Sequence, residues 1–171
     1  YVTDGAKLII QPGTTIVSDI AEKGALIIER GAQLLAEGTS AKPIVFTSGK
    51  AVGERTPGDW GGVVLLGRAT TNRTSEPTIE GGIGRVYGGN NDLDNSGILK
   101  YVRIEYAGIA AMPNSEINAL TLGGVGSGTT IENVQTIYAN DDAFEFFGGT
   151  VNAKHLIAFA GIDDDRDREF I

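Results

Sequence analysis

Val134-Gln-Thr-Ile-Tyr-Ala-Asn-Asp-Asp142 is echoed twenty-two residues later by Leu156-Ile-Ala-Phe-Ala-Gly-Ile-Asp-Asp164. Each stretch is a short, mostly apolar run that ends in a pair of aspartates. Near the start of the chain, Lys7–Ile16 and Ala25–Leu34 form a similar pair, eighteen residues apart. Short apolar strands that return at roughly twenty residues are typical of a β-solenoid, in which each repeat stacks on the next.

The composition indicates a turn-rich β protein and excludes several other classes. Glycine accounts for 25 of 171 residues, about twice its usual share, while the apolar content is ordinary at 41%. A net charge of −8 excludes a nucleic-acid surface, because no basic stripe is present to neutralise phosphates. The absence of cysteine rules out disulfides and thiolate metal sites. No apolar run is long enough to span a membrane as a helix.

The strand spacing predicts an all-β fold, a right-handed parallel β-helix of about seven to eight coils on a period near 20 residues. The expected parallel strands are Leu8–Ile10, Leu26–Ile28, Ile44–Thr47, Val63–Leu66, Val102–Tyr106, Val134–Tyr138 and Leu156–Phe159. Alternation within the strands predicts an inner column of Ile28, Phe46, Leu65, Ile104, Leu122, Phe146 and Leu156. Leu99–Tyr106 is expected to align with Ile131–Tyr138, and Leu120–Leu122 with Phe144–Phe146.

The chain is expected to form one domain over residues 1–171. The periodicity lapses from Thr70 through Asn95, a polar, Gly-rich excursion that is too long for an ordinary connection and predicts a functional loop or a flap. Tyr1-Val2 reads as the inside of a strand, and Phe170-Ile171 follows an acidic loop directly. We therefore expect the sequence to be part of a longer chain.

Three motifs carry a resemblance to a known family. They are Gly31-Ala-Gln-Leu-Leu-Ala-Glu-Gly-Thr39 with Pro43-Ile-Val-Phe-Thr-Ser48, then Gly58-Asp-Trp-Gly-Gly62, and finally Asn140-Asp-Asp-Ala-Phe-Glu-Phe-Phe-Gly-Gly-Thr-Val151. Together they resemble a family of secreted or surface-attached bacterial right-handed parallel β-helix proteins, found in Bacteroidetes and described as hypothetical proteins or lipoproteins. The resemblance implies the fold and a secreted or outer cell-surface location. It implies no particular reaction.

Aspartates at equivalent positions of the repeat form the strongest candidate site. Asp141 and Asp142 precede Asp163 and Asp164 by one period, and two further aspartates, Asp165 and Asp167, follow. Strands on neighbouring coils lie about 4.8 Å apart, so these carboxylates are expected to crowd one corner. A hard divalent cation would relieve their repulsion, which predicts a Ca²⁺ site. Solvated acidic turns remain a second interpretation.

A third interpretation of the acidic corner is catalytic. Parallel β-helix glycosidases place aspartates on consecutive coils as general acid and base, and an inverting pair needs carboxyl groups about 6.5–9.5 Å apart. Asp142 with Asp163 or Asp164 meets that spacing diagonally if the period holds. The single histidine, His155, is expected to be a surface-facing strand residue rather than a catalytic one.

Two weaker candidates lie elsewhere. Asn90, Asp92 and Asp94 alternate before Gly97, which suits either a calcium loop or a chain of Asx turns. Trp60 is placed either to stack on a sugar or to plug the core between coils.

The sequence thus favours a non-catalytic, calcium-stabilised extracellular or cell-surface module with a structural or adhesive role. The alternative is a carbohydrate-active enzyme, a polysaccharide hydrolase or lyase, or a polysaccharide-binding domain that uses the acidic corner. Expected partners are a polysaccharide, another cell-surface protein, or copies of the same chain joined end to end or side by side.

Overall fold

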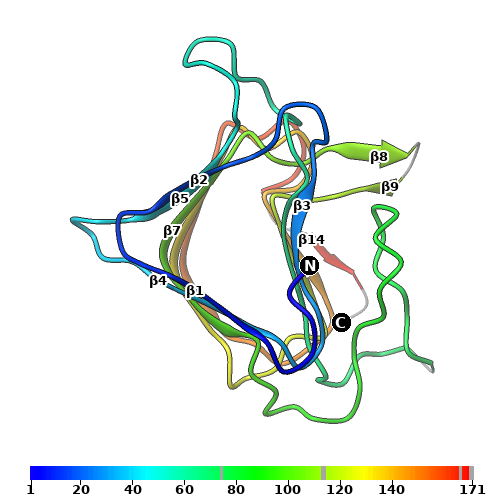
Figure 1. The fold of residues 1–171 in the computed structure, drawn as a ribbon. Coiled ribbons are helices and arrows are strands. Elements are labelled where there is room, and N and C mark those ends of the chain that lie inside the picture. The colour runs from blue at the N-terminus through cyan, green and yellow to red at the C-terminus, as the bar shows by residue number, and fades with distance from the viewer. Residues whose placement is uncertain (74, 113–114, 166, 170–171) are drawn as a thin grey trace.

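The chain winds into a parallel β-solenoid (Figure 1). A computed structural model describes residues 1–73, 75–112, 115–165 and 167–169, and within them every regular element is a strand. Viewed from the N-terminal end, the chain runs clockwise and away from the viewer, so the coil is right-handed (Figure 1). None of the described residues belongs to a helix of the length and apolarity that a bilayer requires.

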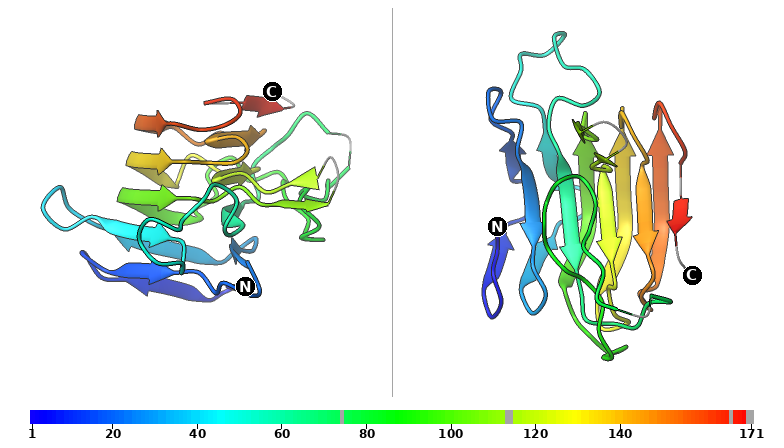
Figure 2. Two further views of the ribbon diagram at one scale, coloured as in Figure 1. Left: turned by 90° about the horizontal axis from the view of Figure 1, so that it is seen from above. Right: turned by 90° about the vertical axis from the view of Figure 1, so that its right-hand side faces the viewer.

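Two parallel sheets form the walls of the solenoid. The first stacks β3 (Ala25–Ile28), β6 (Gly62–Leu66), β10 (Leu120–Gly123), β12 (Phe144–Phe147) and β14 (Asp167–Glu169). The second stacks β1 (Lys7–Ile10), β4 (Gln33–Glu37), β7 (Gly97–Glu105), β11 (Thr130–Ile137) and β13 (Ala153–Phe159). Two short strands, β2 (Thr15–Val17) and β5 (Ile44–Thr47), extend the second sheet beside the later half of β7. Figure 2 shows the strands of each wall stacked in order along the axis.

Antiparallel pairing is confined to local turns of the described chain. The hairpin of β8 (Ala110–Met112) and β9 (Ser115–Glu116) projects from the stack, and two isolated antiparallel bridges lie in loops. None of these joins the strands expected from the sequence, so the prediction of a parallel arrangement is confirmed.

The second sheet bends sharply along one line. β4 pairs with the first half of β7 and β5 with the second half, so a single strand in the third coil replaces two strands and a loop in the second. The bend falls at Tyr101, which has a left-handed φ of 49°, and at the stacked positions Asn133 and His155 in β11 and β13. A left-handed φ at a single residue bends the backbone sharply, so the strand changes direction without a loop.

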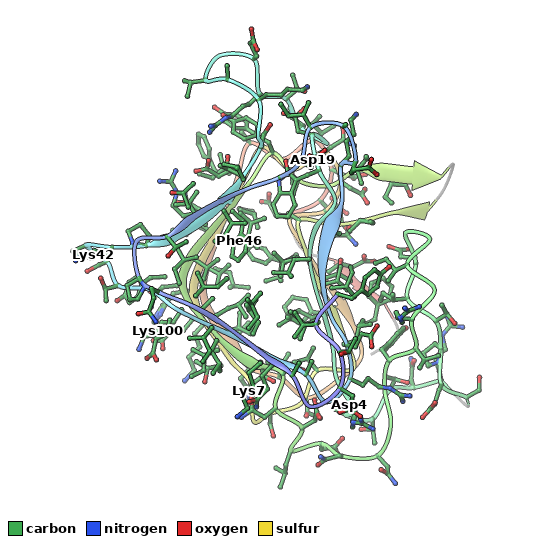
Figure 3. All side chains as sticks on the ribbon, in the orientation of Figure 1. Asp4, Lys7, Asp19, Lys42, Phe46 and Lys100 are labelled. Atoms are coloured by element: carbon green, nitrogen blue, oxygen red, sulfur yellow. The ribbon has the colours of Figure 1, made fainter. Side chains whose placement is uncertain are left out.

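The interior is a column of apolar side chains. Ile28, Phe46, Leu65, Ile104 and Leu122 are buried in it, as expected, and Figure 3 shows Phe46 pointing inward. Two further expected members, Phe146 and Leu156, are only partly buried but pack against the same column. Their strands, β12 and β13, lie near the C-terminal end of the stack, where fewer described residues cover them.

Two details of the repeat differ from the sequence-based prediction. Lys7–Ile10 pairs with Gln33–Ala36, whereas Ala25–Ile28 belongs to the other sheet and pairs with Gly62–Leu65. The eighteen-residue echo therefore compares two walls of the solenoid rather than two coils. In the described chain, each wall stacks five strands along the axis, fewer than the seven to eight coils expected from the sequence. The number is smaller because the early coils are longer and because residues 67–96 leave the stack.

The excursion 67–96 covers the outer face of the first sheet as a strap. Ile79, Ile83 and Tyr87 bury themselves against outward-facing residues of that sheet, and the rings of Tyr87 and Phe147 lie 5.9 Å apart. Ion pairs fasten the strap to the solenoid, with Arg85 Nε 2.6 Å from a carboxylate oxygen of Glu29, just after β3. The wall beneath the strap is therefore buried on both faces (Figure 2).

Replacing Phe144 tests the inner column. Its side chain is 1% exposed in the inner column, so Phe144→Ala should lower the free energy of unfolding by about 3–5 kcal/mol. Phe159→Ala is the matched control, because that ring is 57% exposed on the outside and its loss should cost about 1 kcal/mol or less. Denaturant unfolding measures both, and equal losses would contradict the assignment of the inner column.

Candidate functional site

Backbone hydrogen bonds stack the corners that lead into the first sheet. The Asn140 amide donates to the Ala107 carbonyl at 3.0 Å, and in the next coil the Ile162 amide donates to the Ala139 carbonyl at 2.9 Å. The Ala143 amide then donates to the Asp164 carbonyl at 3.1 Å. These bonds hold the acidic stretches of two successive coils side by side.

Three carboxylates converge at this corner. One oxygen from each of Asp141, Asp142 and Asp163 lies within 4.8 Å of the other two. Asp141 and Asp142 are partly buried and Asp163 is exposed, so the group opens to solvent on one side. We call these three residues the acidic corner. Among the described residues, it is the only group of three or more acidic, histidine or cysteine side chains close enough to hold one metal ion.

Asp141 is an unfavourably placed carboxylate. Burial, together with the negative charges of Glu116, Asp163 and Glu80, raises its pKa to about 6, while the Asp142 backbone amide acts in the opposite direction. Every charged side chain that shifts this pKa is itself acidic. The corner therefore carries a charge conflict that its described neighbours do not remove.

Other acidic residues approach the corner from distant parts of the chain. Glu80 lies on the strap, Glu116 ends the projecting hairpin, and the side-chain amide of the buried Asn118 donates to Glu145 and, at 3.5 Å, to Glu80. Sequence analysis missed these four residues. The alignment of Leu120–Leu122 with Phe144–Phe146 did place Glu145 beside Thr121, but no spacing could place Glu80 or Glu116.

The remaining predicted ligands of the acidic run lie apart from the acidic corner. Asp164 and Asp165 are exposed and do not belong to the converging group. Asp164 contributes instead through its backbone carbonyl, which accepts the Ala143 amide. Asp167 lies in β14 in register with Glu145, and its side chain is outside the described part of the structure.

The second predicted acidic loop acts as a structural anchor. One carboxylate oxygen of Asp92 accepts the Thr70 amide at 2.9 Å and the Thr70 hydroxyl at 2.7 Å, which lowers the pKa of Asp92. Asp94 is buried, and its carboxylate accepts the Ser96 hydroxyl at 3.4 Å. Asn90 is exposed at the edge of this turn. The contacts match the turn interpretation, in which these side chains tie the strap to the solenoid.

Trp60 belongs to the core rather than to an open sugar-binding surface. It is 4% exposed, its ring stacks on Phe46 with centroids 6.5 Å apart, and its indole nitrogen donates to the Glu105 carbonyl at 2.8 Å. The neighbouring Asp59 is also buried, and it accepts hydrogen bonds from Ser48 and Thr56 while pairing with Lys50 at 2.6 Å. Burial opposes ionisation of Asp59, but these partners hold its pKa well below the usual range.

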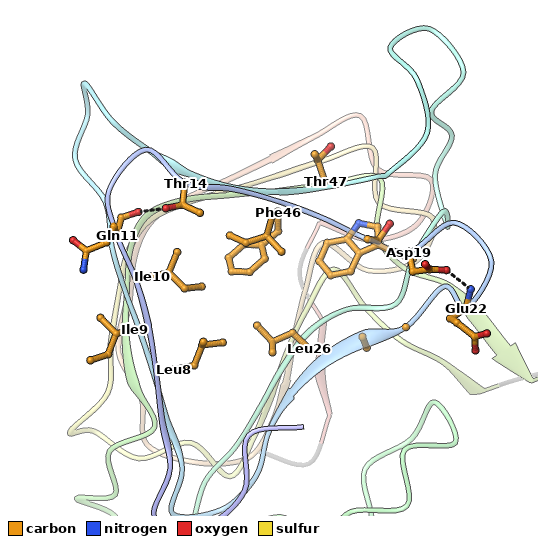
Figure 4. A pocket seen from close by; sticks show the side chains of 15 residues that line it. Leu8, Ile9, Ile10, Gln11, Thr14, Asp19, Glu22, Leu26, Phe46 and Thr47 are labelled. Atoms are coloured by element: carbon orange, nitrogen blue, oxygen red, sulfur yellow. Dashed lines mark hydrogen bonds between the residues drawn. The ribbon is translucent and has the colours of Figure 1, made fainter.

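The N-terminal end of the core is open. A cavity of about 610 Å³ lies there, and Figure 4 shows Leu8, Ile10, Leu26 and Phe46 pointing into it. Trp60 forms part of its lining. β1 and β2 have no strand partner on this side among the described residues, so the cavity is the uncovered continuation of the inner column.

Aromatic rings form an outer ladder that leads into the acidic corner. Tyr106 and Tyr138 stack with centroids 5.2 Å apart, and Phe159 meets Tyr138 edge-on at 6.2 Å. Tyr106, Tyr138 and Ala160 share a left-handed backbone at the stacked turn that precedes each corner. His155 is exposed on the other bend, 3.8 Å from a carboxylate oxygen of Glu132, as its assignment to the surface predicts.

The comparison with protein families agrees with this architecture. A family model described as a pectate-lyase-like β-helix domain matches residues 1–169. The chain belongs to this family. No curated protein and no solved structure matches it. The match confirms the resemblance to parallel β-helix proteins that the sequence motifs indicate. It covers almost the entire pectate-lyase-like β-helix domain.

The raised pKa of Asp141 predicts a pH-dependent stability in the metal-free protein. Because the folded-state pKa of about 6 exceeds the ordinary value of 3.8, the favourable contribution is complete below about pH 4 and is lost as pH rises through 6. Asp141→Asn removes this ionisation and should raise the melting temperature at pH 7 but not at pH 4. Asp165→Asn, an exposed carboxylate outside the group, is the control, and equal effects of both variants at pH 7 would contradict the prediction.

Proposed function

We propose that this β-helix domain is a non-catalytic module of the extracellular space or outer cell surface, with a structural or adhesive role and a Ca²⁺ ion at the acidic corner. The observation that carries the proposal is the convergence of Asp141, Asp142 and Asp163 within 4.8 Å across two successive coils. Carboxylate oxygens are the ligands that hard divalent cations prefer, and Ca²⁺ accepts irregular, partly solvated coordination.

The charge state of the corner supports a cation rather than an acid–base pair. An inverting glycosidase needs carboxyl groups about 6.5–9.5 Å apart to admit a water, and the three oxygens lie closer together than that. The groups that shift the pKa of Asp141 are acidic side chains, so a divalent ion would stabilise several carboxylates at once.

The position of the corner supports a structural role for the ion. Asp141 and Asp142 precede β12, whereas Asp163 precedes β14, so an ion bound to all three would link one coil to the next. Calcium would therefore fasten the end of the stack.

An extracellular location fits the same chemistry. Calcium sites of extracellular modules commonly have dissociation constants near 10⁻⁴–10⁻³ M, and a small, partly exposed carboxylate group suits that weak class. The family description and the resemblance to secreted β-helix proteins support the same location.

Polysaccharide binding is the second candidate function. The family is described by its likeness to pectate lyase, and the aromatic ladder beside the acidic corner favours a sugar ligand. Tyr138 is 38% exposed and Phe159 is 57% exposed, so both rings present area to solvent. Glycan-array binding that disappears in Tyr138→Ala with Phe159→Ala would favour this function over a purely structural one.

Calcium titration tests the first proposal. An ion that binds only the folded state should stabilise it by about 2.7 kcal/mol at one hundred times its dissociation constant. Chelation should accordingly lower the melting temperature of the wild type by more than that of the Asp141→Asn, Asp163→Asn double variant, which lacks two of the three converging carboxylates.

The matched control is Asp164→Asn with Asp165→Asn, which removes the same charge from the same loop outside the converging group. This control should keep the full response to chelator. Identical melting of metal-free wild type with and without added Ca²⁺ would overturn the proposal and favour ordinary solvated turns.

A further inference from the structure

A second group of oxygen donors lies beneath the strap, beside the acidic corner. Thr121 of β10 and Glu145 of β12 are register partners, and both are buried. Leu120 and Leu122 pack in the inner column, so strand alternation points Thr121 to the opposite face, under the strap. Asn118 approaches the same place and donates its side-chain amide to both Glu145 and Glu80.

The strap places Glu80 there by packing. Ile79 and Ile83 are buried on either side of it, and a methyl group at Gly81 would come within 2.4 Å of the Ile117 side chain. The strap backbone therefore presses directly on the segment that carries Asn118. Glu80 is partly buried and lies between these two anchors, at the edge of the interface.

Thr121 supplies an independent sign that something is bound. Its side chain is 2% exposed and its hydroxyl oxygen makes no hydrogen bond. A buried hydroxyl without a partner is costly, and this one lies on the same face as the Glu145 carboxylate. A ligand between the two groups would satisfy the hydroxyl through its lone pairs.

We propose that Glu80, Asn118, Thr121 and Glu145 form a second divalent-cation site, which ties the strap to the first sheet. The donors are two carboxylates, an amide and a hydroxyl, an all-oxygen set suited to Ca²⁺. Without an ion, the side-chain amide nitrogen of Asn118 donates hydrogen bonds to both carboxylates, in the place that a cation would otherwise take. On binding, rotation of the amide presents its oxygen to the ion instead, a change that needs no backbone movement.

The two sites are neighbours but use different side chains. Glu80 contributes to the raised pKa of Asp141, so a cation beside Glu80 would also favour ionisation of the acidic corner. Ion binding would thus join three separate parts of the chain: the strap, the coil corners and the first sheet. The second site does not depend on the first, and each can fail alone.

Calorimetric titration of the metal-free protein with CaCl₂ tests the proposal. The wild type should bind two ions, Glu80→Gln should bind one, and Asp141→Asn with Asp163→Asn should retain the other. A single ion that is lost in the double aspartate variant would overturn the second site and leave the proposed function intact. No binding in the wild type would overturn both, and two ions unaffected by Glu80→Gln would place the second ion elsewhere and overturn this assignment.

Thr121→Val separates a ligand from a merely buried hydroxyl. Valine has nearly the same shape and removes the unpartnered oxygen, so in chelator the variant should melt at or above the wild-type temperature. With Ca²⁺ it should bind the second ion at least tenfold more weakly and lose part of the calcium-induced rise in melting temperature. An unchanged calcium response would show that Thr121 is no ligand and would contradict the site.

Discussion

The parallel register between successive coils is the constraint on which the rest of the structure depends. Backbone hydrogen bonds fix which residue of one coil lies over which residue of the next, and side chains follow in columns. The same register that stacks Leu120 on Phe144 inside the solenoid places Thr121 beside Glu145 on its outer face. The packing of the core, the acidic corner and the contacts of the strap therefore all depend on this register. A register shift of one residue would exchange the buried and exposed faces of the strands.

Two aspartates, the buried Asp59 and the partly buried Asp141, show that the corners neutralise charge differently. Asp59 has its own ammonium, two hydroxyls and a backbone amide, and its pKa is lowered. Asp141 is surrounded by other acids, and its pKa is raised. The first arrangement balances the charge of its carboxylate within the chain, whereas every charged side chain that shifts the pKa of Asp141 is acidic. The contrast is the reason that the proposed Ca²⁺ site lies at Asp141 and not at Asp59.

The sequence was informative wherever a similar strand motif recurs on the same wall of successive coils, even though those coils differ in length. Three pairs of residues that the sequence aligns are register partners in the sheets: Leu99 with Ile131, Leu120 with Phe144, and Val134 with Leu156. The eighteen-residue echo near the N-terminus was wrong because similar apolar patterns recur on different walls within one coil, and composition does not distinguish the walls. Glu80 and Glu116 were unpredictable for another reason. Their positions depend on how the strap and hairpin fold back, which follows from packing of Ile79, Ile83 and Ile117 rather than from any period.

The loop at residues 48–58 has an evolutionary consequence. It projects sideways from the solenoid at the top of Figure 1, its base is fastened by Asp59, and Val52 in the loop is 88% exposed. Strands β5 and β6 on either side keep their partners regardless of what lies between them. Insertions and deletions at this tip would leave the ladder untouched, so sequence length can drift here at little cost. The same property makes the tip a natural place to display a foreign peptide on a rigid base.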